Sequence, residues 1–577
     1  MPRWNLGELP PPPRFTAKNW AMLIGPGFVT AGAAIGGGEW LLGPIVAARY
    51  GGALLWLATL SILGQVIYNA EVSRYTLYTG EPIFVGKFRL PPGPRFWLWT
   101  YVALDFGSVF PYLAANAATP LAAAFLGRIP HEGGTFMAAG TTWTDTGLVH
   151  SLRYFCFLLA IVPLTVGGKI YTSLKAVMMV KVVVVFGFLG FLALFFSTPN
   201  TWREIGVGFV SFGTVPSERG EDLNGNGRLD EGEDWDGDGR LDVVERRLAP
   251  AIDTNGDGAP DAWADVTGDG KPDRFEDVDG DGFRDGENAE NVFAALLAGR
   301  PLPALDLTLI GFLAALAAVA GNGGLTSATV STYTRDQGWG MGRLVGAVPS
   351  LVGGRNLRLS HVGTVFAITD DSVARFRGWF RHVLRDQLVI WMPACFLGIA
   401  LPSMLSIQFL RRGTEASDWS AASMTADAAA ASIGPPLGPF VWFMTLFCGF
   451  LVLAPSAAST ADGFLRRWVD VFWTGSARLR KLDPERIRQV YFGVLCAYTA
   501  VGLVALTLAP PRQLILWATV IYNYALGVSC WHALAVNVVL LPRELRPGWG
   551  TRIGLLATGL FFTALAVVTT LNRLGMV

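Results

Sequence analysis

Two short glycine-rich interruptions break apolar segments of this chain, and their residues could bind an ion or a small solute. The first interrupts the segment 19–47 and the second the segment 305–334. Glycine disfavours helix and leaves peptide N–H and C=O groups open to neighbours. Discontinuous helices at corresponding positions of two halves of a chain are typical of binding sites in secondary transporters. The pattern predicts one central substrate site formed by Gly36, Gly37, Gly38, Glu39, Gly321, Asn322, Gly323 and Gly324.

Glu39 is the only acid in either interruption, and a carboxylate in the middle of an apolar segment is costly unless it faces a cavity or a partner. It could ligate a cation, pair with a substrate amine or take up a coupling proton. The alternative is a favourable charge at the amino end of an outer half-helix. Asn322 could offer an amide oxygen to a cation or hydrogen-bond the loosened backbone.

Three further residues are candidates for ion coupling. Asp105 is an acid inside an apolar segment, and the sequence does not identify its partner. Ser459 and Thr460 could complete a sodium site against carbonyl groups of the first interrupted segment, an arrangement that would resemble the site of sodium-coupled transporters. Capping of helical carbonyls within their own segment is the alternative role for these hydroxyls.

The elements that must position these residues are membrane-spanning helices. Of the 577 residues, 51% are hydrophobic and only 16% are charged, which indicates a polytopic membrane protein and not a soluble multidomain enzyme. Lys and Arg on alternate loops predict a cytoplasmic amino terminus and an extracytoplasmic carboxyl terminus. No enzyme motif is evident in a plausible context, and the five cysteines show no disulfide or zinc spacing. We expect eleven spans, at 19–47, 52–72, 96–126, 152–166, 174–196, 305–334, 388–410, 439–460 (closed by Arg466 and Arg467), 490–508, 514–541 and 553–571.

A strongly acidic region, 222–288, separates the fifth and sixth predicted spans and contains 16 Asp and 5 Glu against 7 Lys and Arg. The pattern Asp-x-Asp/Asn-x-Asp/Asn-Gly-x-x-Asp occurs in it five times, except that Thr267 takes the third position of the fourth repeat. Oxygen ligands at this spacing, with glycine at the sharp turn, suit calcium loops, and a disordered acidic tether is the alternative. The third and fifth repeats have Ala264 and Asn288 in place of a final Glu, so we expect these two repeats and the fourth to bind more weakly or to borrow neighbouring carboxylates. The predicted Ca²⁺ ligands are Asp222, Asn224, Asn226, Asp230, Glu233, Asp234, Asp236, Asp238, Asp242, Glu245, Asp253, Asn255, Asp257, Asp261, Asp265, Asp269, Asp273, Glu276, Asp277, Asp279, Asp281 and Asp285.

Several stretches of the apolar segments resemble the Nramp family of metal-ion transporters. They are Gly25-Pro26-Gly27-Phe28, Tyr78-Thr79-Gly80, the run 325–335 ending in Tyr333-Thr334-Arg335, and Ser459-Thr460-Ala461-Asp462-Gly463. The acidic region is instead similar to the calcium repeats of thrombospondin type 3 and dockerin-like modules. The Nramp resemblance implies an all-α polytopic fold of the LeuT type, with two inverted five-helix repeats and an eleventh helix. The resemblance implies a first repeat in 1–212 and a second repeat with the last span in 293–577, and the predicted topology makes 213–292 between them an extracytoplasmic insertion.

The departures from the Nramp pattern concern the site itself. The first interruption lacks the family's Asp-Pro-Gly-Asn, and the second lacks its Met-Pro-His. In the third span Asp105 matches the family's Asp, but Ser108 replaces the Glu that the family has three residues later. Without a thioether, selectivity for transition metals is not expected. We expect a secondary transporter in the cell (inner) membrane that moves a hard divalent cation, with Na⁺ or H⁺ as the coupling ion. The alternatives are an ion-coupled transporter of an amino-acid-like solute and a calcium-dependent membrane receptor.

Overall fold

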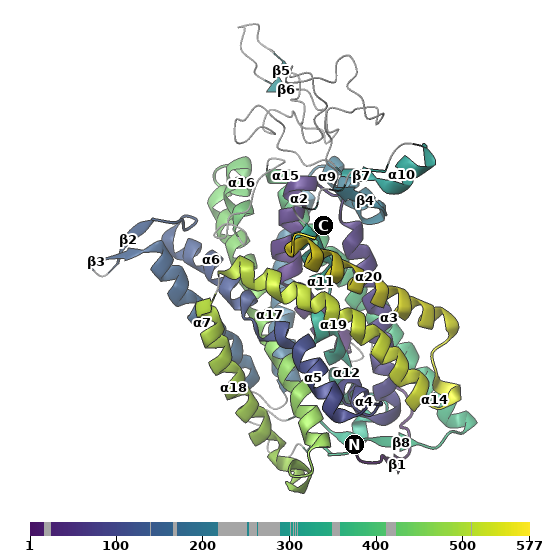
Figure 1. Cartoon of the computed structure of the whole chain (residues 1–577). Coiled ribbons are helices and arrows are strands. Elements are labelled where there is room, and N and C mark those ends of the chain that lie inside the picture. The colour runs from purple at the N-terminus through teal and green to yellow at the C-terminus, as the bar shows by residue number, and fades with distance from the viewer. Residues whose placement is uncertain are drawn as a thin grey trace.

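The structure is a computed structural model, and it describes residues 1–14, 16, 25–138, 140–165, 170–216, 251–252, 262–263, 289–299, 302–303, 305, 307, 310–348, 358–410, 423–508 and 510–576. Figure 1 shows a bundle of long helices with short strands at both ends. All the predicted calcium ligands lie outside the described residues, so the calcium loops stay a prediction.

The two interrupted segments form discontinuous helices, because neither glycine-rich stretch continues a regular helical turn. The first consists of α1 (Pro26–Ala34), a π-helical turn η2 (Gly38–Leu42) and α2 (Gly43–Tyr50). The second consists of α11 (Ile310–Val319), a 3₁₀ turn η5 (Gly324–Ala328) and α12 (Thr329–Asp336). Helix α11 packs directly against η2, which brings the two discontinuous helices together in the middle of the bundle.

The remaining helices surround this pair. In chain order they are α3 (Trp56–Thr79), α4 (Ile83–Lys87), α5 (Pro94–Leu104), η3 (Phe106–Val109), α6 (Tyr112–Leu126), α7 (Asp145–Thr165), α8 (Ile170–Phe195), α9 (Pro199–Val210), α10 (Val292–Leu297), α13 (Gly342–Val345), α14 (Asp370–Arg385), η6 (Asp386–Trp391), α15 (Met392–Phe409), α16 (Met424–Ile433), α17 (Gly438–Gly475), η7 (Leu479–Lys481), η8 (Pro484–Arg486), α18 (Ile487–Leu508), α19 (Pro511–Leu540), η9 (Arg543–Leu545) and α20 (Trp549–Arg573). Helices α3, α8, α17 and α19 contact the discontinuous helices directly.

Ten helical stretches in the described part of the chain are long and apolar enough to cross a membrane. Helix α3, at the second predicted span, has 24 residues but carries buried polar side chains such as Gln65, Asn69 and Glu71. These side chains are turned into the bundle, so α3 belongs to the polar interior. The chain is thus an all-α, multi-pass membrane protein.

Short strands lie at the two ends of the bundle. The strands β4 (Thr214–Pro216) and β7 (Ala289–Asn291) pair antiparallel at the ends of the predicted insertion, with β5 (Ala251–Ile252) and β6 (Ala262–Trp263) paired within it. At the opposite end, β1 (Asn5–Gly7) pairs parallel with β8 (Thr364–Phe366). A hairpin of β2 (Thr135–Ala138) and β3 (Thr141–Thr144) precedes α7. The amino terminus and the connections of the insertion therefore lie at opposite ends of the molecule (Figure 1).

Two of the predicted spans that carry or adjoin site residues differ from the structure. The span predicted at 96–126 is not one helix, because α5 ends before Asp105 and α6 begins after Pro111. The span predicted to close at Arg466 and Arg467 continues as α17 to Gly475. Both arginines are buried, with exposed fractions of 0% and 1%, because carboxylates from other helices pair with them. The prediction that they close this span was wrong.

Candidate functional site

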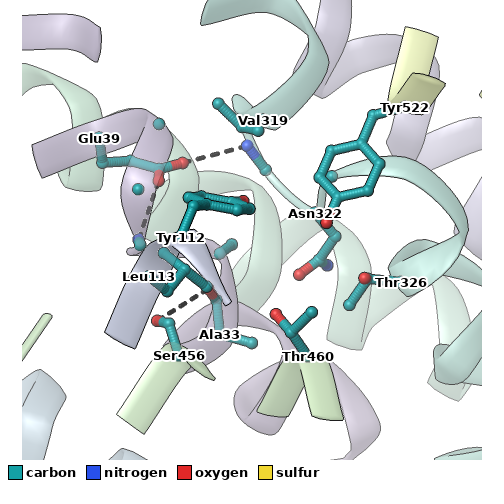
Figure 2. A pocket seen from close by; sticks show the side chains of 16 residues that line it. Ala33, Glu39, Tyr112, Leu113, Val319, Asn322, Thr326, Ser456, Thr460 and Tyr522 are labelled. Carbon is teal, nitrogen blue, oxygen red and sulfur yellow. Dashed lines mark hydrogen bonds between the residues drawn. The ribbon is translucent and has the colours of Figure 1, made fainter. Parts of the chain in front are cut away.

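The two helix interruptions face one another across a very short distance (Figure 2). A Cβ atom added at Gly38 would lie 2.5 Å from Cγ2 of Val319 and 2.9 Å from the carbonyl oxygen of the same residue. Such distances are below van der Waals contact, so glycine at this position is what permits the backbones to approach. Gly321 has a positive φ of 96°, a conformation that favours glycine.

The Glu39 side chain bridges the two interruptions. Its Oε2 accepts a hydrogen bond from the backbone N–H of Gly36 at 2.9 Å, and its Oε1 accepts one from the backbone N–H of Gly321 at 3.1 Å. Glu39 is fully buried. The carboxylate thus accepts a backbone N–H from each interrupted segment, that of Gly36 in its own segment and that of Gly321 in the other. Glu39 also lines the cavity described below.

Asn322 and its neighbours form a second polar connection. In the amide orientation that satisfies both ends, the Asn322 side chain donates to the carbonyl of Thr30 (3.2 Å) and accepts from Nε1 of Trp391 (3.1 Å). The backbone N–H of Asn322 donates to Oε1 of Gln65 at 2.9 Å, and Ser327 Oγ donates to the same atom at 3.0 Å. Gln65 in α3 is a site residue that sequence reasoning missed, because nothing in its local context marks it.

A small cavity lies where the interruptions meet (Figure 2). It offers about 30 Å³ to the centres of water-sized molecules, enough for about two waters. Glu39 is the only charged side chain in the lining, and the other polar side chains there are hydroxyls and one amide; the lining contains no His, Cys or Met. The lining residues are Ala33, Ala34, Gly36, Gly37, Gly38, Glu39, Tyr112, Leu113, Val319, Gly321, Asn322, Gly323, Thr326, Ser456, Thr460 and Tyr522.

The residues of α17 differ in part from the sequence prediction. Thr460 lines the cavity, and Ser459 is buried. The hydroxyl that contacts the first interrupted segment is instead that of Ser456, which donates to the carbonyls of Ala33 and Ile35, each at 3.3 Å. A hydroxyl of α17 therefore does contact the first interrupted segment, but it belongs to a residue about one helical turn earlier in the sequence than Thr460. The packing of α17 against α1 decides which of its side chains face α1.

Asp105 lies at the break between α5 and η3 and has a clear partner. Its carboxylate accepts hydrogen bonds from Arg467 at 2.8 and 3.1 Å, from Trp468 Nε1 at 3.0 Å and from Ser108 Oγ at 2.7 Å. Arg467 also donates to the carbonyl of Leu325 in η5 at 3.1 Å. This ion pair therefore links the third span and α17 to the second discontinuous helix.

A larger buried charge network continues from this pair along α17. Arg466 pairs with Asp462 and with Asp336, and Arg335 pairs with Asp336 and Asp470. Two tyrosine hydroxyls, those of Tyr333 and Tyr491, donate to Asp462. Buried charges of this density are stable only when they are paired and hydrogen-bonded, and sequence reasoning missed the network because its members come from distant segments.

The described residues contain no group of three or more His, Cys, Asp or Glu side chains that could hold a metal ion. Any metal in the central cavity must therefore be held by Glu39, by hydroxyl, amide and carbonyl oxygens and by water. Such a donor set fits hard cations better than transition metals.

The helix arrangement and the central cavity define a multi-pass membrane protein with a transporter fold. Solved structures of a manganese transporter from Eremococcus coleocola match nearly the whole chain. The complex of that transporter with an aromatic bis-isothiourea compound has a TM-score of 0.52 and 10% sequence identity, covering 98% of this chain and 90% of the other. A single-residue variant of it also gives a TM-score of 0.52 at 10% identity, covering 97% and 88%. Neither a family model nor a curated protein sequence matches this chain.

Proposed function

We propose that this chain is a secondary-active transporter of Nramp ancestry that moves a hard divalent cation through the cavity between its two helix interruptions. The observation that carries the proposal is the cavity itself. It lies at the junction of both discontinuous helices, offers oxygen donors and one carboxylate, and contains no sulfur or imidazole. Mg²⁺ and Ca²⁺ bind through oxygen ligands, and Mg²⁺ keeps several waters with only one or two carboxylates.

The size of the cavity favours an ion over an organic solute. Room for about two waters accommodates a partly hydrated ion, whereas an amino-acid-like solute has several non-hydrogen atoms and needs a much larger space. The solved structures that share the fold are described as manganese transporters, which supports cation transport on this scaffold. Oxygen ligands accommodate Mg²⁺, Ca²⁺ and Mn²⁺, and the lining lacks the thioether that would favour manganese over the other two.

The rest of the proposal follows the topology. We place the protein in the cell membrane with its amino terminus in the cytoplasm and the insertion outside, where the repeats in 222–288 bind Ca²⁺ as a separate module. Asp105, with its partner Arg467, is proposed as part of the coupling machinery, because this pair joins the third span to η5, and Thr326 of η5 lines the cavity.

Uptake into liposomes tests the proposed function. Purified protein is reconstituted with a fluorescent divalent-cation indicator inside, and Mg²⁺, Ca²⁺ and Mn²⁺ are added outside, while parallel vesicles receive radiolabelled neutral amino acids. We expect Mg²⁺ or Ca²⁺ uptake that exceeds Mn²⁺ uptake and no amino-acid uptake. Amino-acid uptake without cation uptake would support the solute transporter instead.

A variant without residues 222–288 removes the calcium repeats as a source of bound metal. We expect cation uptake to persist in it, whereas its complete loss would favour the calcium-dependent receptor. Calorimetry on the same variant checks selectivity, because micromolar Mn²⁺ binding to it would contradict the proposed hard-cation site.

A further inference from the structure

The helix that follows the predicted insertion exposes apolar side chains outside the transmembrane bundle. This helix, α10, lies within residues 291–299, which contain no charged side chain. Phe293, Leu296 and Leu297 are 56%, 65% and 89% exposed, and their spacing of three and four residues places them on one face of the helix. Large apolar side chains gathered on one exposed face mark a contact with an apolar partner.

The start of α10 is fixed by the side chain of Asn291, the last residue of β7. Its Oδ1 accepts the backbone N–H of Ala294 at 3.0 Å, which caps the helix. Its Nδ2 donates to the carbonyl of Phe212 at 2.8 Å and to Thr214 Oγ1 at 3.1 Å. These hydrogen bonds set the direction in which α10 leaves the β4–β7 pair, so the exposed face is part of the folded structure.

The β4–β7 pair is in turn attached to the end of α3, the helix at the second predicted span. Trp56, the first residue of α3, donates from Nε1 to the carbonyl of Thr214 at 2.8 Å, and its ring packs edge-on against that of Phe212. Thr59 of α3 donates to the carbonyl of Phe209 in α9 at 2.8 Å. Tryptophan at the end of a span is typical of the boundary between membrane and water. The base of α10 is thus held at this boundary.

Exposed apolar side chains also lead from the lipid-facing surface of a span toward α10. Leu194 and Phe195 are strongly exposed at the end of the fifth predicted span. In α9, which begins at Pro199, Val207 and Val210 are exposed as well. Figure 1 shows α10 projecting to one side of the bundle, close to the level at which α2 and α15 end. A lateral position at this level is where the surrounding lipid leaflet begins.

We propose that α10 is an interfacial anchor, whose Phe293, Leu296 and Leu297 side chains insert into the lipid leaflet on the side of the insertion. Interfacial helices bury an apolar face about 5–10 Å deep, at the boundary between headgroups and acyl chains. A helix of 6 residues is far too short to cross the membrane. Because β4 and β7 are the two ends of the predicted insertion, the anchor holds both of these ends beside the membrane.

The size of the exposed face favours lipid over a protein partner. A stable protein interface takes about 20–30 residues from each partner, and α10 together with the exposed valines of α9 provides far fewer. Lipid chains adapt to any apolar shape and need no matching surface. The inference concerns the membrane and goes beyond the proposed function, so it holds whichever ion is transported, and an absence of cation uptake would not affect it.

Spin labelling of the full-length chain in lipid nanodiscs tests the anchor. Cys496 is exposed and the other cysteines are buried, so Cys496→Ser gives a background in which one introduced cysteine reacts. A nitroxide label on Leu297→Cys reports collisions with oxygen, which concentrates among lipid chains, and with a water-soluble nickel chelate. Val183→Cys, exposed in the middle of α8, provides the lipid reference, and Arg358→Cys, on an exposed loop, provides the water reference.

We expect the ratio of oxygen to nickel collisions at Leu297→Cys to be severalfold above that at Arg358→Cys and to approach that at Val183→Cys. A ratio equal to that of Arg358→Cys would mean that α10 faces water and would overturn the proposal. Slow collisions with both reagents would mean that protein covers the helix, either a second copy of this chain or another segment of it, and this result would overturn the proposal as well.

The second experiment removes the apolar face. The label is moved to Phe293→Cys, and both leucines are replaced, as Leu296→Glu and Leu297→Glu, because a carboxylate enters the hydrocarbon layer only at a large cost. We expect the ratio at Phe293→Cys to fall severalfold toward the water reference. The control Leu6→Glu changes a strongly exposed leucine in β1, at the opposite end of the molecule, and should leave the ratio unchanged.

An unchanged ratio in the double glutamate variant would contradict insertion into the leaflet, and so would an equal fall in Leu6→Glu. The melting temperature of each variant shows whether the bundle is still folded. If the double variant does not fold, the comparison of Leu297→Cys with the two references decides the matter.

Discussion

Replacing Glu39 by Gln tests whether this side chain holds the two helix interruptions together. The carboxylate accepts one backbone N–H from Gly36 and one from Gly321. Gln has a single acceptor oxygen, so it can accept only one of the two backbone N–H groups. The other N–H would face the amide NH₂ group and would have no acceptor. A hydrogen bond to a charged group contributes about 1.5–3 kcal/mol, and an unsatisfied buried donor costs about 1–3 kcal/mol. We therefore expect a loss of about 2–4 kcal/mol in the free energy of unfolding.

Thermal unfolding of the purified protein in detergent, in the absence of substrate cation, measures this effect apart from any loss of binding. For a chain of this size we expect the melting temperature to fall by several degrees, and we expect cation uptake to be abolished. Glu204→Gln is the matched control, because Oε1 of Glu204 accepts the backbone N–H of Gly52 at 2.8 Å outside the cavity and an amide oxygen can replace it. Equal melting temperatures for Glu39→Gln, Glu204→Gln and wild type would refute the bridging role.

Three further predictions concern other parts of the molecule. Gly38→Ala should abolish uptake and destabilise the fold by about 1–3 kcal/mol through overpacking, because the added Cβ would lie 2.5 Å from Val319. The control Gly43→Ala, whose Cβ would lie 3.3 Å from its nearest neighbouring atom, should melt close to wild type. Equal uptake by both variants would argue against the close approach. Asp105→Asn should cost about 3–5 kcal/mol by leaving the buried Arg467 guanidinium without its counter-charge, measured by thermal unfolding, and a melting temperature equal to wild type would contradict it. Chelation of calcium should raise protease sensitivity in 222–288 without melting the helices, and equal digestion with and without calcium would count against the calcium loops.

The sequence predicts those features of this protein that depend on local composition. Long apolar stretches indicate membrane helices because a bilayer demands about twenty such residues, and the helical breaks follow from glycines that cannot sustain a helix. Glu39, Asn322 and the other residues of the predicted substrate site could therefore be placed in one cavity before the structure was known, except that Gly324 does not line it. Which groups Glu39 and Asn322 contact could not be predicted, because Gly321, Thr30 and Trp391 come from segments far away in the sequence from the residue that each of them contacts.

The tertiary structure alone decides which charged residues are buried and what they contact. In the sequence, Arg467 follows an apolar segment and was expected to close it, and Lys181 lies in an apolar run without any neighbouring acid. In the fold, Arg467 meets Asp105 from a segment more than three hundred residues away, and Lys181 meets Ser456 at the end of α1. A charge can remain in a membrane interior only where distant segments supply its partner or its oxygen ligands, and that condition is set by how the helices pack.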